Sequence, residues 1–158
     1  NNAGVTAISH GTDGGAPTLA TLDQHPREVI ESNAPGVSLG WILSPKTRSK
    51  TVRTQNFTGS STALTVTRDG RDETIGFPSI ATTFMPDNLT KGNGTGLGSA
   101  VFGDWSTLYA MIWPVLEISV DRVTNEGSGM TTVYLESYAD VVCPRPECFR
   151  RAVDVVTT

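Results

Sequence analysis

Two histidines, each close to an aspartate, are the residues with the most obvious catalytic potential. His10 lies three positions before Asp13, and His25 lies two positions after Asp23. Acyl transfer also needs an activated nucleophile and oxyanion donors, and the sequence contains no Gly-x-Ser-x-Gly nucleophile elbow. The simpler interpretation is a solvated histidine in a loop. We therefore predict no catalytic residues, and a small hydrolase that uses His10 or His25 stays a remote alternative.

The two cysteines offer a second possible chemistry, because Cys143 and Cys148 flank the short segment Pro-Arg-Pro-Glu. A zinc site needs about four ligands, and the histidines lie far upstream. We predict no metal and no other cofactor, and two unpaired, partly buried thiols. Two cysteines do not make a disulfide framework, so a reduced, intracellular setting is the default expectation.

A glycine-rich segment, KGNGTGLG at residues 91–98, could in principle cradle a phosphate. It lacks the Gly-Lys-Ser/Thr ending of a P-loop, and no helix signal follows it. We expect a flexible surface loop. The basic segment Lys46–Arg53 could contact nucleic acid or an acidic neighbouring subunit, but charge runs usually form a solvated face.

Composition limits the function classes. The 158 residues suit one domain. The net charge of −4 argues against nonspecific phosphate binding over the whole surface. No stretch approaches the roughly 20 apolar residues that cross a bilayer, so no membrane partner is expected. The chain starts with Asn-Asn-Ala-Gly, which is neither an initiator methionine nor a signal peptide, and we interpret this start as an internal cut.

Two helices are expected in the first third of the chain. Apolar residues recur at helical spacing within residues 18–33, where Asp23 could cap a helix with Pro26 in its first turn. Ser44-Pro45 can open a second helix over residues 46–54, which has only Val52 as an apolar anchor. That helix must be short and largely exposed.

Most of the other periodic segments read as strands. The segment 37–43 is short and apolar, and 75–81 contains Pro78, which indicates an edge or bulged strand. Val101-Phe102 is followed by Gly103-Asp104, which we interpret as a glycine turn with Asp104 accepting hydrogen bonds beside Trp105 and Ser106. The remaining strand candidates are 5–8, 55–69, 116–121 with one wet face, 130–142 and 149–156. This order predicts an α+β fold.

Four stretches, in this order, carry a resemblance to a known family. They are GWILSP at residues 40–45, IGFPSI at 75–80 with Met85-Pro86, VFGDWS at 101–106 with Tyr109, and RPECF at 145–149. The first resembles a strand that ends in Asn-Pro or Ser-Pro, and the second resembles a leucine-glycine-x-proline-valine segment. The third resembles a phenylalanine-glycine-aspartate turn, and the fourth resembles a terminal proline-glutamate-alanine-phenylalanine. The chain thus resembles the C-terminal portion of the tailed-phage major capsid proteins of the Hong Kong ninety-seven type.

The resemblance implies a fold and its signature positions. Residues 1–136 would form an axial domain with a central mixed sheet flanked by two helices, and 137–158 would supply the terminal strand or strands of a peripheral domain. The residues that carry the resemblance are Pro45, Gly76, Pro78, Gly103, Asp104, Trp105, Pro146 and Phe149.

The implied function is structural and not enzymatic. Subunits would associate into hexamers and pentamers of a phage or prophage head, enclosing double-stranded DNA without binding it specifically. A scaffolding protein or maturation protease is a possible partner. Assembly would occur in the bacterial cytoplasm, and the final location would be the virion. An accessory particle protein, such as a decoration or tail module, is the alternative.

Contacts between subunits are expected on polar and glycine-rich segments that could point to a capsomer axis. The predicted interface residues are Lys46, Arg48, Lys50, Gly92, Gly94, Gly96, Asn125 and Gly127.

Overall fold

The computed structural model describes residues 4–114, 116–121 and 126–157. The chain forms two compact units, each described here by itself. The sheet unit comprises Asn1–Thr107 and Arg145–Thr158, and the ribbon unit comprises Leu108–Pro144. These boundaries differ from the sequence-based division at residue 136, and the assignment of axial and peripheral domains stays a prediction.

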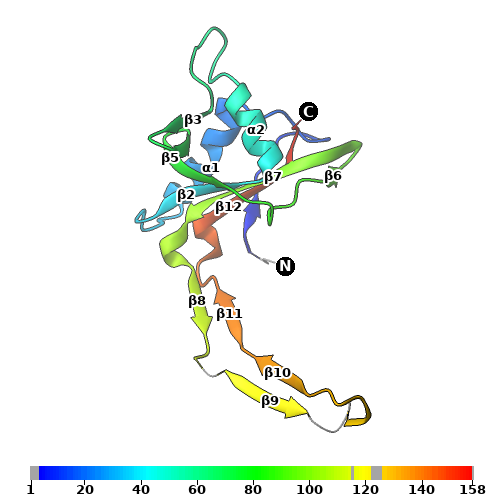
Figure 1. Cartoon of the computed structure of the whole chain (residues 1–158). Coiled ribbons are helices and arrows are strands. Elements are labelled where there is room, and N and C mark those ends of the chain that lie inside the picture. Colours follow the sequence, from blue (N-terminus) through cyan, green and yellow to red (C-terminus); the bar gives the residue numbers. More distant parts are fainter. Residues whose placement is uncertain (1–3, 115, 122–125, 158) are drawn as a thin grey trace. The chain divides into compact units, whose positions relative to one another are not determined.

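An eight-stranded mixed sheet forms the centre of the sheet unit (Figure 1). The strand order is β1-β12-β7-β2-β5-β4-β3, and β6 pairs with β7 outside this path. The pairs β1–β12 and β2–β5 are parallel, and the others are antiparallel. The strands are β1 Thr6–Ala7, β2 Leu39–Leu43, β3 Thr65–Arg68, β4 Arg71–Thr74, β5 Phe77–Ala81, β6 Leu89–Lys91, β7 Gly94–Asp104 and β12 Phe149–Val155. The predicted α+β fold with a central mixed sheet is confirmed.

The first helix, α1 Leu19–Glu31, lies within the predicted window 18–33 but begins before the position that a cap at Asp23 would give. Its N-cap is Thr18, whose hydroxyl accepts from the Thr21 backbone N–H in a capping box. Asp23 is therefore inside the helix, and the prediction that it caps the helix was wrong. Pro26 lies in the helix interior and is buried, so the Leu22 carbonyl lacks its usual intrahelical donor.

The second helix, α2 Pro45–Arg53, has Ser44 as N-cap and Pro45 in its first turn, as predicted. Hydroxyl groups rather than apolar side chains attach it to the sheet. Thr51 and Thr47 are fully buried, and the Thr65 hydroxyl donates to the Thr51 hydroxyl at 2.8 Å. This is the anchor that the apolar pattern could not reveal, because threonine counts as polar in such a pattern.

The hydrophobic core lies between the sheet and the helices. Leu22 and Val29 of α1 pack against Trp41 and Leu43 of β2, with Phe102 of β7 in the same cluster. The rings of Trp41 and Phe102 have centroids 4.9 Å apart. Both helices lie on one face of the sheet (Figure 1).

The glycine-rich segment forms the start of the longest strand, so the flexible-loop prediction was wrong for most of it. Gly92 has a φ of +56° in the turn between β6 and β7. Gly94 begins β7, and a Cβ there would lie 2.0 Å from the Asp13 carbonyl oxygen. A Cβ on Gly98 would lie 2.3 Å from Thr47 Oγ1. The glycines allow close approach of neighbouring segments rather than flexibility.

The segment with Pro78 also differs from its prediction. β5 pairs with β2 on one side and β4 on the other, so it is not an edge strand. Pro78 lies opposite Glu73 in a short antiparallel pairing. Ile75 and Gly76, with φ values of +50° and +76°, form the tight turn that precedes β5, which explains glycine at position 76.

The ribbon unit consists of two two-stranded antiparallel pairs among its described residues. β8 Tyr109–Ile112 pairs with β11 Ala139–Val142, and β9 Glu117–Asp121 pairs with β10 Thr132–Glu136.

Short 3-10 helices occur at Trp105–Thr107, Glu126–Ser128 and Pro146–Cys148. None of the helices in the described part of the chain has the length and apolar character that spanning a bilayer requires.

Replacing Gly94 by alanine tests the close approach between β7 and the segment around Asp13. Gly94→Ala is expected to lower the free energy of unfolding by about 1–3 kcal/mol, because the new methyl group overlaps backbone that must shift. Urea denaturation measures this change. The control is Gly127→Ala, where a Cβ has nothing within 4 Å and the change should stay within about 0.5 kcal/mol. Equal stability of Gly94→Ala and the parent chain would contradict this role of Gly94.

Candidate assembly surfaces

A buried carboxylate, Asp104 at the end of β7, joins two distant segments of the sheet unit. One oxygen accepts the backbone N–H of Gly36 at 2.6 Å and of Val37 at 3.2 Å. The other accepts the backbone N–H of Ser38 at 3.1 Å and both the N–H and the hydroxyl of Ser106. Asp104 therefore holds the loop before β2 on the end of β7.

These hydrogen bonds also determine the protonation state of Asp104. Burial acts to raise the pKa of Asp104, but the bonds from Ser106, Ser38 and Val37 outweigh it, and the pKa lies below its ordinary value. The predicted local bond to Ser106 is confirmed. The bonds to residues 36–38 were missed, because nothing in the sequence relates positions so far apart.

Gly103 lies within β7, so the prediction of a turn at this residue was wrong. It pairs with Phe149, the first residue of β12. A Cβ on Gly103 would lie only 2.1 Å from Phe149 Cδ1. The ring of Trp105 packs edge-on against Phe149 with centroids 5.3 Å apart, and its Nε1 donates to the Gly40 carbonyl at 3.1 Å.

Several of the predicted signature residues thus meet in one place, which we call the crossing cluster: Gly103, Asp104, Trp105 and Phe149. The chain leaves the sheet unit after Thr107 and returns to it at Arg145. The Thr107 hydroxyl donates a hydrogen bond to the Asp104 backbone carbonyl at 2.8 Å. Pro146 begins the 3-10 helix that leads into β12. Pro45, Gly76 and Pro78 lie in α2, the β4–β5 turn and β5, and are not part of this cluster.

The predicted basic interface residues lie on α2, and two of them have acidic partners within the chain. Arg48 forms a two-pronged ion pair with Asp72 of β4, and this pair raises the pKa of Arg48 and lowers that of Asp72. Lys46 lies 3.4 Å from an Asp87 carboxylate oxygen and is half exposed. Lys50 is partly buried. Of the three, Lys46 is the most accessible to a neighbouring subunit.

The predicted glycine contacts differ in their surroundings. Gly92 and Gly94 lie against the segment at Asp13, whose carboxylate also accepts the Asn93 N–H at 2.9 Å. Gly96 has a φ of +66° and open space around a would-be Cβ. Gly127 is exposed in the 3-10 helix of the ribbon unit. Asn125 lies outside the described residues.

The ribbon unit exposes apolar side chains on both faces. The strand predicted at 116–121 is confirmed as β9. Its Ile118 and Val120 share one face and Glu117 and Ser119 the other, but both faces are exposed, so the apolar face is not buried within this chain. Ile112 is 71% and Leu135 is 62% exposed. Other large apolar side chains on the ribbon surface are Trp113, Leu116, Ile118, Val133, Tyr138 and Val141. So much exposed apolar surface is typical of a protein contact region.

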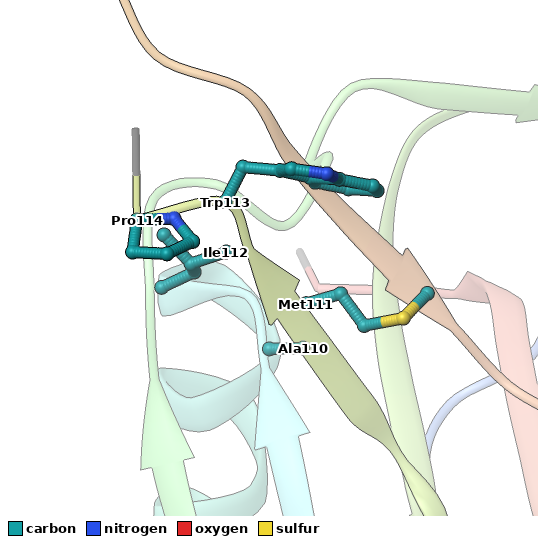
Figure 2. A pocket seen from close by; sticks show the side chains of 5 residues that line it. All are labelled: Ala110, Met111, Ile112, Trp113 and Pro114. Carbon is teal, nitrogen blue, oxygen red and sulfur yellow. The ribbon is translucent and has the colours of Figure 1, made fainter. Parts of the chain in front are cut away.

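An open hollow of about 410 Å³ lies beside β8 and is lined by Ala110, Met111, Ile112, Trp113 and Pro114. Met111 and Trp113 extend to one side of the strand, and Ile112 and Pro114 extend to the other (Figure 2). No charged side chain lines it. An uncharged hollow of this kind suits an apolar protein segment better than a charged small ligand.

The candidate catalytic residues occupy surroundings that the sequence did not suggest. The side chains of His10 and His25 are both buried, not solvated, and their ring centroids lie 5.7 Å apart. His10 contacts Asp154 rather than Asp13, and the Nδ1 atom of His25 lies beside the Thr21 carbonyl oxygen. Cys143 and Cys148 are both free thiols, as predicted, but only Cys143 is partly buried, whereas Cys148 is fully buried.

Comparison with known proteins agrees with this geometry. The model of the phage capsid family matches residues 1–153. The chain belongs to the phage capsid family. No curated protein sequence matches it significantly.

Several solved structures share the fold. The SrpI encapsulin complex from Synechococcus elongatus gives a TM-score of 0.63 at 17% identity, over 100% of this chain and 55% of that one. The structure from Mycobacterium phage Che8 gives a TM-score of 0.63 at 12% sequence identity, over 94% of this chain and 53% of that one. The capsid of an empty GTA particle gives a TM-score of 0.62 at 13% sequence identity, over 95% of this chain and 50% of that one. The chain thus spans about half the length of the structures it matches.

The crossing cluster of this capsid-family chain can be tested at Asp104. Asp104→Asn keeps the shape but leaves an NH₂ group facing backbone donors, and we expect it to lower the free energy of unfolding by about 2–3 kcal/mol. Denaturant titration at pH 7 measures this loss. Because the folded pKa is lowered, the difference from the parent chain is complete above pH ~4 and shrinks below it.

The matched control is Asp23→Asn on the exposed face of α1, which should change stability by less than about 0.5 kcal/mol. Equal effects of the two substitutions would contradict the role given to Asp104.

Proposed function

We propose that this chain is the structural part of a major capsid subunit of the Hong Kong ninety-seven type, from a tailed phage or prophage. The observation that carries the proposal is the family match over residues 1–153. Such subunits would assemble into hexamers and pentamers of the head and would act without catalysis.

The ribbon unit supports the proposal of self-association. Isolated two-stranded pairs are only marginally stable in water, because they bury little apolar surface. Here the ribbon also leaves large side chains such as Ile112, Trp113 and Leu135 exposed. Other protein segments that cover these side chains would stabilise the ribbon. The apolar ribbon is thus the surface that we expect assembly to bury first.

The net charge of the chain is consistent with a shell that encloses DNA. A net charge of −4 gives little general attraction to phosphates, so packaged double-stranded DNA would be enclosed without specific binding. The virion would be the final location, reached after assembly in the host cytoplasm. A scaffolding protein and a maturation protease are further partners that we propose on the resemblance alone.

Negative-stain microscopy of the complete gene product that contains this chain tests the proposal. Shells or six-membered rings are the expected result. Monodisperse small particles from a folded product would contradict it and would favour an accessory protein that attaches to preformed shells.

Among the predicted contact residues, Lys46 allows the sharpest test. Lys46→Glu is expected to reduce the yield of capsomers at least tenfold at low salt, because it places a negative charge at a contact we expect to be basic. Sedimentation of assembled material measures the yield, and the melting temperature of the subunit should stay unchanged. Arg48 is less suitable for this test, because its two-pronged ion pair with Asp72 is less exposed than the pair of Lys46 with Asp87, whose loss at the surface should cost little stability.

The matched control is Arg27→Glu, which reverses the charge of another side chain that is 60% exposed on a helix. Normal assembly of Lys46→Glu, or equal loss of assembly in both variants, would remove α2 from the interface.

A further inference from the structure

A buried polar cluster joins the N-terminal segment to the C-terminal strand. The Asp154 carboxylate in β12 is 1% exposed. It accepts the backbone N–H of His10 at 2.9 Å and the Lys91 ammonium at 2.6 Å, and it lies 3.0 Å from His10 Nδ1. The Ser9 hydroxyl approaches the same carboxylate at 3.4 Å. One carboxylate is thus shared by three side chains and a backbone amide.

His25 of α1 lies directly beside this cluster. Its ring is 5.7 Å from that of His10 and 5.2 Å from that of Trp41, measured between centroids. Its Nδ1 lies 3.2 Å from the Thr21 carbonyl oxygen. The Nε2 atoms of His25 and His10 are both buried without a hydrogen-bond partner among the described residues. A proton added to this pair would find no acceptor at either Nε2.

The two carboxylates near His25 among the described residues are already paired with cations. On β12, Asp154 is paired with Lys91 from β6. On α1, Glu28 is paired with Arg150 of β12. Desolvation, followed by the charge of His10, lowers the pKa of His25 to about 4, although the Thr21 and Leu22 carbonyls and Glu28 act in the opposite direction.

Asp154 stays ionised over the same pH range. Burial acts to raise its pKa, but the hydrogen bonds from Lys91 and His10 outweigh this effect and lower the pKa. Between pH 7 and 5 Asp154 therefore stays a carboxylate, and a pH dependence of strap opening through this site must come from protonation of His25.

The cluster fastens a segment that we call the N-terminal strap, residues 6–15. β1 pairs in parallel with β12, and the Ile8 N–H donates to the Arg151 carbonyl at 2.8 Å. The Gly15 N–H donates to the Asp154 carbonyl, and the Val156 N–H donates to the Gly15 carbonyl. The strap therefore covers the outer edge of β12, and its His10 ring covers His25.

We propose that the His10–His25 pair is an acid-sensitive latch, in which protonation of His25 releases the N-terminal strap from β12 while the rest of the sheet unit stays folded. Release lets water reach the His25 ring and solvate its charge. It also leaves the outer edge of β12 without a strand partner, open to pairing with another extended segment.

The direction and size of the pH effect on strap opening follow from the difference between the pKa of His25 in the closed state and in the open state. In the closed state His25 releases its proton at a lower pH than in the open state, where an ordinary pKa near 6.5 applies. Opening is therefore least favourable above pH 6.5 and gains from pH 6.5 down to about 4. Between pH 7.5 and 5.0 the opening equilibrium should rise about 30-fold.

Amide hydrogen exchange of the chain at pH 7.5 and 5.0, corrected for intrinsic rates, tests the latch. The protection of the Ile8, His10 and Gly15 amides should fall about 30-fold and should not depend on low urea concentrations, as in local opening. Amides of β2 and β7 should show the steeper urea dependence of global unfolding. Strap amides that follow the urea dependence of the core amides at both pH values would overturn the proposal.

His25→Asn provides the second arm, because its amide can still donate to the Thr21 carbonyl but cannot be protonated. In this variant the protection of the strap amides against exchange should no longer depend on pH. A pH dependence as large as in the parent chain would overturn the proposal. If this variant does not fold, an NMR titration of the parent chain decides the question. The His25 ring and the strap amides should titrate with one midpoint, and separate midpoints would exclude the latch.

Discussion

The carboxylate of Asp104 is the interaction on which the arrangement of the sheet unit depends. It accepts hydrogen bonds from the loop at residues 36–38 and from Ser106, and so it fixes the approach to β2 on the end of β7. The neighbouring Gly103 makes room for Phe149 at the start of β12. The three central strands are thereby aligned where the chain passes out to the ribbon unit and back. A buried ionised group is tolerated here because its acceptor capacity is satisfied by several donors.

The two units have different physical characters, which together fit a capsid-family protein. The sheet unit buries its own core, with Trp41, Phe102 and Leu22 almost fully excluded from water. The ribbon unit does not, since the apolar face of its β9–β10 pair, which carries Ile118 and Leu135, is exposed. A chain of this kind is stable in part by itself and in part through its neighbours, as expected of a subunit that acts in an assembly.

The sequence predicted the features that depend on local signals. The helix α2 with Ser44 and Pro45 at its start, the strand β2 and the strand β12 all follow from capping residues and apolar runs. Features that depend on contacts between distant residues were missed. The glycine pattern at the start of β7 predicts a flexible loop, because the carbonyl of Asp13 and the hydroxyl of Thr47 that require Gly94 and Gly98 lie far away in sequence. The burial of His10 and His25 could not be predicted for the same reason, since Asp154 beside His10 and Trp41 beside His25 lie far away in sequence.

The most direct test of the account is a cryo-EM reconstruction of the particles formed by the complete gene product. The central claim is that the apolar side chains of the ribbon unit become buried in the assembly. We predict that Ile112, Trp113 and Leu135 lie against other protein segments within a shell. A shell in which these side chains face solvent, or a product that forms no shell, would contradict it.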